Sequence, residues 1–408
     1  MCRQKVVLGP DAADVLRRGS WQTSLQGVVA VLLRFFSAVI AFAQPMLCYY
    51  GLVQNPVIRV GISSCLLGRK VRYDGGHQLD TLITEILGKY FEWVPVCPEM
   101  EIGLGAPRET LRLVGDAKRP RLVGTESGRD HTGTMTEWAG KRLEELAQLD
   151  LDGCILKKGS PSCGMERVPV YREGKTARST GTGIYAGLLL GRFSLLPVEE
   201  EGRLRDVSNR ENFVERVFAH HRWQGFVKAK PRPGDLVRFH ARHKLTLLSH
   251  SGKHYRELGR LVAGAGKRKM NRVLDEYGCL FMEALRIRAT PGKHANVLLH
   301  ILGFLKDKIE ADDRAEVTAA IDGYRKQLVS LAVPIILLRH HLRRHPIPWL
   351  FEQVYFTPCP AEPMLRNQVD LSRLQLVIPK FVRHIQTPSD QLRFGSGPRR
   401  RLGRSCLI

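Results

Sequence analysis

The segment VIRVGISSCLLGRKVRYDGG, residues 57–76, begins as an apolar, β-branched run and ends as a polar, glycine-containing loop. A short Val/Ile run bounded by glycine is typical of an interior strand of a parallel sheet. In such sheets, functional groups lie just beyond the carboxyl ends of the strands. The segment therefore predicts a buried strand that delivers Cys65 to a loop.

Two later segments repeat this arrangement. FEWVPVCPE, residues 91–99, runs from a strand-like stretch to Cys97, and LDGCILKKGSPSCG, residues 151–164, runs from another to Cys163. Because the carboxyl ends of parallel strands meet at one edge of a sheet, we expect the three cysteines to converge. Cys154 lies inside the apolar run that precedes Cys163 and is expected in the core.

Helix-like and strand-like segments alternate between residues 57 and 198. Amphipathic helices are predicted at Leu79–Tyr90, Thr134–Leu149 and Thr182–Phe193, and further strands at Phe91–Val96, Gly153–Leu156 and Ser194–Val198. The alternation predicts an α/β fold, a Rossmann-like parallel sheet with helices on both faces. Residues 103–133 are dominated by Gly, Arg, Pro and Thr, which predicts a long loop over the strand ends.

The pattern becomes purely helical from about residue 199. Apolar positions recur at three-to-four spacing in six segments, residues 210–227, 234–249, 251–263, 271–288, 294–308 and 314–328, and Pro334 is expected to start a seventh helix. The prediction is an all-α helical domain over residues 199–367 behind an α/β domain over 57–198. Residues 368–408 form a basic tail without periodicity, expected to be disordered.

Residues 1–56 are predicted to be a poorly ordered extension. They include an apolar run at 27–43 that resembles a membrane span, but Arg34 at its centre is costly in hydrocarbon, so no stable membrane association is expected. We identify no cleavable secretory signal, and the nine cysteines do not form a disulfide framework. A reducing, cytoplasmic location is therefore expected.

The formal net charge of +23 is unevenly distributed. Residues 199–368 carry 30 Lys and Arg against 19 Asp and Glu, whereas residues 57–198 carry 20 against 17. A basic module beside a nearly balanced one predicts a polyanionic partner, with nucleic acid the first candidate. Eleven of the 14 histidines lie in the basic region. A second metal site and contacts to RNA are both open interpretations, and no HExxH pattern is present.

The wide spacing of Cys65, Cys97 and Cys163 excludes the CxxC knuckles of structural zinc sites. One interpretation is three buried thiols that behave as small hydrophobic groups. Each cysteine, however, lies in a polar turn that contains Gly or Pro, which favours a role as a ligand. Three thiolates without an evident fourth suit an iron–sulfur cluster with one iron left open.

The blocks SSCLLGRKVRYDGG, VCPEMEIGLGAPRE and LKKGSPSCG resemble the signature of the thiouracil desulfidase family, in the same order and at comparable spacing. The resemblance implies a [4Fe-4S] cluster bound by Cys65, Cys97 and Cys163, with Glu99 and Ser160 serving the chemistry. Residues 101–105 depart from the more glycine-rich run that the family shows. The helical part resembles an accessory domain, and the fused arrangement is similar to bacterial enzymes that desulfurate 4-thiouridine in transfer RNA (tRNA), the partner that this implies.

A thiocarbonyl sulfur is soft and binds an open iron readily, which weakens the carbon–sulfur bond toward water without electron transfer. Glu99 is positioned in sequence to take a proton from water and Ser160 to supply one, although Glu99 as a structural hydrogen-bond acceptor stays open. Five further residues are candidate substrate contacts, each with a surface or turn role as its alternative: Ser64, Asp74, Arg108, Lys157 and Ser162.

Three functions follow from these observations: an RNA desulfidase, a desulfidase of free thiolated bases or nucleosides, and a non-catalytic iron–sulfur protein that binds RNA. A radical enzyme is disfavoured because no CxxxCxxC triplet occurs. A cysteine hydrolase is disfavoured because no histidine has a clear place beside the three strand ends.

Overall fold

The computed structural model describes residues 56–172 and 175–359. The chain divides into two compact units, Met1–Val57 and Ile58–Ile408, and every element named below lies in the second. The predictions for the N-terminal extension, with its apolar run at 27–43, and for the tail at 368–408 lie outside the described residues. Among the described residues, no helix combines the length and apolar character needed to cross a membrane.

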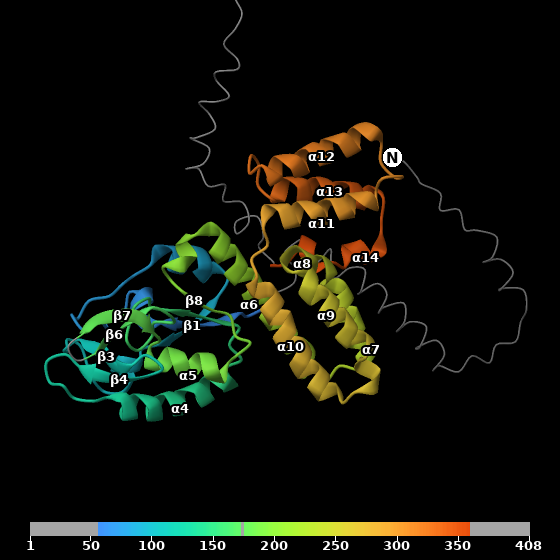
Figure 1. The fold of residues 1–408 in the computed structure, drawn as a ribbon. Coiled ribbons are helices and arrows are strands. Elements are labelled where there is room, and N and C mark those ends of the chain that lie inside the picture. The colour runs from blue at the N-terminus through green and yellow to red at the C-terminus, as the bar shows by residue number, and fades with distance from the viewer. Residues whose placement is uncertain (1–55, 173–174, 360–408) are drawn as a thin grey trace, which may run out of the picture. The chain divides into compact units, whose positions relative to one another are not determined.

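A four-stranded parallel sheet forms the centre of the α/β part (Figure 1). Its strand order is β2-β1-β5-β8, and every pairing in it is parallel. The strands are β1 (Arg59–Ser63), β2 (Glu92–Val96), β5 (Gly153–Leu156) and β8 (Val198–Glu200). The predicted strand at Gly153–Leu156 is confirmed, and the last strand begins at Val198 rather than Ser194.

Apolar side chains cover both faces of this sheet. On one face, α4 (Thr132–Gln148) and α5 (Ile184–Arg192) pack with Val96 and Leu156. On the other, α6 (Val207–Lys228) presents Phe213 and Val217 to Val60, Ile62 and Ile155. The prediction of an α/β sheet domain followed by a helical domain is confirmed, and α6 buries residues in the sheet core as well as in the helical core.

The prediction of a long loop over residues 103–133 is wrong, because this stretch contains a β-hairpin. A second sheet, order β4-β3-β6-β7, consists of β3 (Leu111–Asp116), β4 (Arg119–Gly124), β6 (Val168–Arg172) and β7 (Lys175–Gly181). Leu113 and Leu122 are fully buried while their neighbours Arg112 and Arg121 are exposed. Half-buried strands alternate in this way, and their exposed arginines concealed the alternation.

The predicted helix at Leu79–Tyr90 is much shorter than expected. It consists of a π-helical turn, Leu82–Ile86, followed by a 3-10 turn, Leu87–Lys89. Only Ile83 and Leu87 are fully buried in it. Both side chains belong to the core cluster that contains Val60 and Ile62. The apolar spacing was therefore predicted correctly, whereas the regular α-helix was not.

The C-terminal region is helical, as predicted. The predicted helix at 234–249 is divided at His243, which ends α7 and precedes α8. Helix α13 begins at Ala332, so Pro334 lies within its first turn, where a missing N–H costs no hydrogen bond. The helices are α7 (Pro233–Arg242), α8 (Lys244–His250), α9 (Gly252–Ala263), α10 (Met270–Arg286), α11 (Pro291–Gly303), α12 (Ala311–Arg325), α13 (Ala332–Arg344) and α14 (Pro348–Phe351).

Gly153→Ala is expected to destabilise the contact between β5 and α6. A Cβ atom at this position would lie 2.8 Å from Cγ2 of Val217 and 3.4 Å from Cζ of Phe213. Overpacking of this kind costs roughly 1–3 kcal/mol in the free energy of unfolding, which urea denaturation measures. Gly140→Ala is the control, because Gly140 lies on the exposed face of α4 and nothing lies within 4 Å of its Cβ position. Alanine also has a higher helix propensity than glycine. Equal stability of the two variants would contradict the packing argument.

Candidate active site

The three cysteines follow strands that are neighbours in the parallel sheet. Ser63 at the end of β1 pairs with Val96 at the end of β2, and Ile62 pairs with Ile155 of β5. Cys65 lies in the 3-10 turn after β1, Cys97 directly follows β2 at the start of α3 (Pro98–Glu101), and Cys163 lies in the loop after β5. Because β2, β1 and β5 are parallel neighbours, the loops that carry the three cysteines leave the sheet at the same edge, as expected.

The loop that carries Cys163 is held at the N-terminus of α5. Backbone N–H groups of Gly183, Ile184 and Ala186 donate to the carbonyls of Gly164, Pro161 and Ser162, respectively, at 2.8–3.1 Å. These N–H groups have no partner inside the helix, so the loop satisfies them. A Cβ atom at Gly183 would lie 2.5 Å from the carbonyl oxygen of Ser162. Glycine is required there because the cysteine loop approaches the helix so closely.

Burial keeps the three thiols neutral in the metal-free protein. Desolvation raises the pKa of Cys65 to about 11 and that of Cys97 above its ordinary value. Desolvation raises the pKa of Cys163 well above its ordinary value, and the charges of Glu99, Cys97 and Cys65 raise it further. The three thiols therefore lie within electrostatic reach of one another. Neutral, buried thiols are poor nucleophiles, which argues against a cysteine hydrolase.

Three cysteine thiols supply the type of donor that an iron–sulfur cluster requires. In the part of the chain that the structure describes, no group of three or more His, Cys, Asp or Glu side chains is placed to hold a metal ion. A single ion draws thiolates to about 2.3 Å from itself, as zinc does. A multinuclear cluster takes each thiolate at a different iron, so its ligands stand farther apart. Three cysteines within electrostatic reach of one another fit that second requirement.

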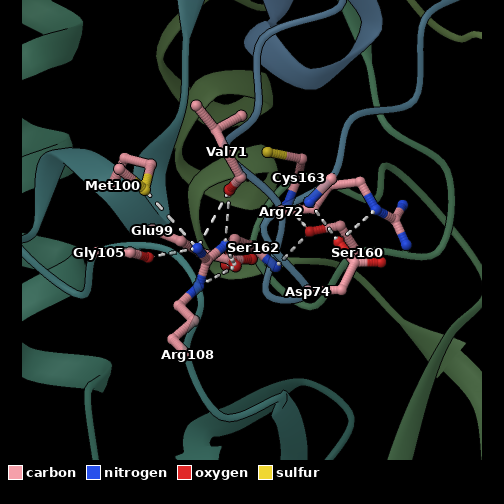
Figure 2. A network of polar contacts seen from close by, with 11 residues as sticks. Val71, Arg72, Asp74, Glu99, Met100, Gly105, Arg108, Ser160, Ser162 and Cys163 are labelled. Atoms are coloured by element: carbon pink, nitrogen blue, oxygen red, sulfur yellow. Dashed lines mark hydrogen bonds and ion pairs between the residues drawn. The ribbon is translucent and has the colours of Figure 1, made fainter.

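Glu99, on α3, is held by a network of polar contacts (Figure 2). Arg108 donates from Nε to Oε2 of Glu99 at 3.1 Å and pairs with the same oxygen through Nη2. The remaining guanidinium donors reach the carbonyls of Val71, at 3.1 Å, and Gly105, at 2.6 Å. Only 7% of the Arg108 side chain is exposed. Arg108 was a candidate for substrate binding, and in the structure its donors hold Glu99 and two loops together.

The Ser160–Cys163 loop reaches the same carboxylate. Ser162 is fully buried and donates from Oγ to Oε1 of Glu99 at 2.9 Å. Oγ of Ser160 accepts the N–H groups of Ser162, at 3.2 Å, and of Cys163, at 3.1 Å. Glu99, Ser160 and Ser162 are thereby brought together with the cysteine loop, and Ser162, a candidate substrate contact, is bound to Glu99.

The other candidate contacts are placed differently. Ser64 is buried beside Cys65 in the turn after β1. Lys157 pairs through Nζ with Glu201, and its charge lowers the pKa of Cys65 against the larger effect of burial. Asp74 is exposed and accepts the N–H of Gly76 at 2.9 Å, and this hydrogen bond lowers the pKa of Asp74. Ser64 and Lys157 thus border the thiols, whereas Asp74 shapes a surface loop.

Comparison with known proteins assigns this region to a family. A family model described as 2-thiouracil desulfurase matches residues 60–201, the range that contains all three cysteines and Glu99. YbbK of Bacillus subtilis (strain 168), an uncharacterized protein, is 34% identical over 134 residues, which are 31% of this chain and 87% of YbbK. The chain belongs to the 2-thiouracil desulfurase family.

The part that follows the desulfurase domain matches a different family. A model described as a protein of unknown function (DUF1722) covers residues 244–360.

YbgA of Escherichia coli (strain K12), also uncharacterized, is 31% identical over 153 residues, which are 37% of this chain and 90% of YbgA. A solved structure described as the [4Fe-4S]-dependent thiouracil desulfidase TudS is 29% identical and covers 36% of this chain and 94% of its own, with a TM-score of 0.30.

Two charged residues of the desulfurase domain were missed by the sequence analysis. Arg72 lowers the pKa of Cys65 against the larger effect of burial, so its guanidinium lies near that thiol. Glu201 accepts the N–H of Lys158 at 2.7 Å besides pairing with Lys157. Arg72 belongs to the RYDGG stretch, residues 72–76, in the same sequence block as Cys65, so its place near that cysteine could have been predicted. Glu201 follows β8, and only the strand order brings it beside Lys157.

Arg108→Gln is expected to lower the free energy of unfolding by about 3 kcal/mol. The change leaves the carboxylate of Glu99 without its compensating charge in a site where only 16% of that side chain is exposed. It also removes the guanidinium N–H groups that donate to the carbonyls of Val71 and Gly105. Urea denaturation measures the loss. Lys141→Gln, which breaks a pair with Glu137 on the exposed face of α4, is the control and should cost little. A loss as small as that of the control would contradict the assigned role of Arg108.

Proposed function

We propose that this protein is an iron–sulfur-dependent desulfidase that converts 4-thiouridine in transfer RNA to uridine and releases sulfide. The observation that carries the proposal is the convergence of Cys65, Cys97 and Cys163 at one sheet edge, in a domain of the 2-thiouracil desulfurase family. Replacing a thiocarbonyl sulfur by the oxygen of water needs no electron donor. The reaction is therefore a hydrolysis and not a reduction.

The three cysteines would hold a four-iron, four-sulfur cluster, whose iron without a protein thiolate supplies a Lewis acid with affinity for a soft sulfur. Binding requires the thiols to lose their protons, because the thiolate is the ligand. The raised pKa of each thiol makes that step more costly than for exposed cysteines. The positive charges of Lys157 and Arg72 beside Cys65 reduce this cost.

Glu99 is the proposed acceptor of a proton from the attacking water. Arg108 binds one of its oxygens and Ser162 the other, so the carboxylate is fixed in orientation. A carboxylate offers about four lone-pair positions, so it can accept a further hydrogen bond while both partners stay in place. A general base must lie within hydrogen-bond reach of its water, and this further lone pair is where such a water would bind.

Ser160 is the proposed proton donor. In both hydrogen bonds of its hydroxyl, with the N–H groups of Ser162 and Cys163, the oxygen is the acceptor. The hydroxyl hydrogen is therefore left to point toward a substrate atom, such as a ring nitrogen or the departing sulfur. Glu99 would take a proton from water, Ser160 would pass its proton to the departing sulfur, and the protonated Glu99 would restore the serine, so that both protons of water leave with the sulfide.

Charge favours a polynucleotide as the substrate. The excess of eleven positive charges over residues 199–368 suits the backbone of RNA, whose phosphates dominate the affinity of such complexes. A free base presents no phosphate and gives the basic domain nothing to bind. Free thiouracil or a thionucleoside is the alternative substrate, and an iron–sulfur RNA-binding protein without activity is the third hypothesis.

The proposed function is tested by incubating the anaerobically reconstituted protein with tRNA that contains 4-thiouridine and, separately, with free 2-thiouracil. We expect uridine in the digested RNA and sulfide in solution. Cys97→Ser is expected to lose cluster absorbance and activity, whereas Cys279→Ser, an exposed cysteine on α10, is expected to keep both. Sulfide from thiouracil alone would favour the free base as substrate, and sulfide from neither would contradict the proposal.

Glu99→Gln is expected to retain the cluster and lose activity at least a hundredfold. Glutamine keeps the size of the side chain and one acceptor oxygen, so it can accept from Arg108 or from Ser162 but not from both. It cannot take a proton from water, and general-base catalysis contributes on the order of 10²–10⁴ to a rate. Cluster absorbance and sulfide release are measured on the same preparation. Normal turnover with an intact cluster would leave Glu99 only the structural role.

A further inference from the structure

A structured surface loop, residues 69–78, borders the turn that carries Cys65, since the N–H of Gln78 donates to the carbonyl of Cys65 at 2.9 Å. Arg72 and Gly76 close it through a backbone hydrogen bond of 3.2 Å, and the N–H of Gly75 donates to the carbonyl of Arg72 at 3.0 Å. Asp74 accepts the N–H of Gly76 inside the loop. These bonds give the loop a defined shape although it lies at the surface.

An aromatic ring is presented at the surface of this loop. Tyr73 is 43% exposed, and the guanidinium carbon of Arg72 lies 5.4 Å from the centroid of its ring. Arg72 is itself held by Asp74, at 3.5 Å, and by Gln78, at 3.3 Å. The cation covers one face of the ring at a distance that is attractive. The tyrosine is therefore oriented in advance, with surface left for a ligand.

The same loop is tied to the candidate active site. The N–H of Arg108 donates to the carbonyl of Tyr73 at 2.8 Å, and the guanidinium of Arg108 joins the carbonyl of Val71 to Glu99. Figure 2 shows Val71 and Arg72 in the same close-up as Glu99 and Ser160. Arg72 also lies near enough to Cys65 to affect that thiol. Tyr73 is thus adjacent in sequence to a residue whose charge acts on Cys65.

Two cations at the start of the loop remain available. Arg69 and Lys70 are exposed, and their side chains make no hydrogen bond or ion pair with any other described residue. Exposed cations beside an exposed aromatic ring form the combination that binds single-stranded nucleic acid, in which bases stack and phosphates are neutralised. A protein that took only a free base would gain nothing from the cations.

We propose that Tyr73 is the stacking platform for the nucleotide that flanks the thiolated one, with Arg69 and Lys70 beside the phosphates of that strand. The inference rests on the proposed function and adds a site on the desulfurase domain itself. The target base would enter between the thiols and Glu99, while its neighbour stacks on the ring. Stacking of one base on an aromatic side chain is worth about tenfold or more in affinity.

Tyr73→Ala tests this site in the full, reconstituted chain with both substrates, tRNA that contains 4-thiouridine and free 2-thiouracil. We expect the variant to raise KM for the RNA, so that kcat/KM falls about tenfold more for RNA than for thiouracil. Tyr73→Trp, which keeps an aromatic face, is expected to restore most of the RNA activity. Cluster absorbance must match that of the wild-type protein in each preparation.

Tyr171→Ala is the matched control. Tyr171, on β6 of the second sheet, is 41% exposed and has Arg112 at 5.7 Å from its ring, but it makes no contact with the loop at 69–78 among the described residues. Equal losses for the two alanine variants, or an equal loss of Tyr73→Ala on both substrates, would overturn the stacking role. Inactivity of the wild-type protein on both substrates would instead contradict the proposed function.

Discussion

The parallel pairing of β1 with β2 on one side and β5 on the other is the constraint on which the site depends. Parallel neighbours run in the same direction, so the loops that leave their carboxyl ends open onto one edge of the sheet. Cys65, Cys97 and Cys163 are up to 98 positions apart in the sequence, yet each leaves the sheet at that edge. A register change in either pairing would separate the three thiols.

Burial at this edge favours uncharged groups, and the surrounding residues compensate for the charges that the chemistry needs. Desolvation holds the three thiols protonated in the metal-free chain. The charge of the Glu99 carboxylate in this region is compensated by the opposite charge of Arg108. The guanidinium of Arg108 is fixed by its hydrogen bonds to Glu99 and to the carbonyls of Val71 and Gly105. Breaking such a buried pair costs more than its formation gains, so the loss of either partner is expected to destabilise this region of the protein.

Several features of the fold and the site were predictable from residues alone. Apolar runs that end in Cys65 and Cys97 predicted two strand ends, and both are confirmed by β1 and β2. The hairpin of β3 and β4 was missed because Arg112 and Arg121 occupy its exposed positions, so a half-buried alternation resembled a polar loop. The helical region was predicted well, since its helices bury one face each and the three-to-four period is local in sequence.

The sequence by itself determined which groups are present: three cysteines after strand-like runs, Glu99 two residues beyond one of them, and serines before another. Only the tertiary structure decided how they are used. It places Arg108 on Glu99 rather than toward the surface, and it brings the charge of Arg72 near Cys65. The reason is physical. Strand periodicity depends on neighbours along the chain, whereas the partner of a buried charge is chosen by the packing of segments that lie far apart in sequence.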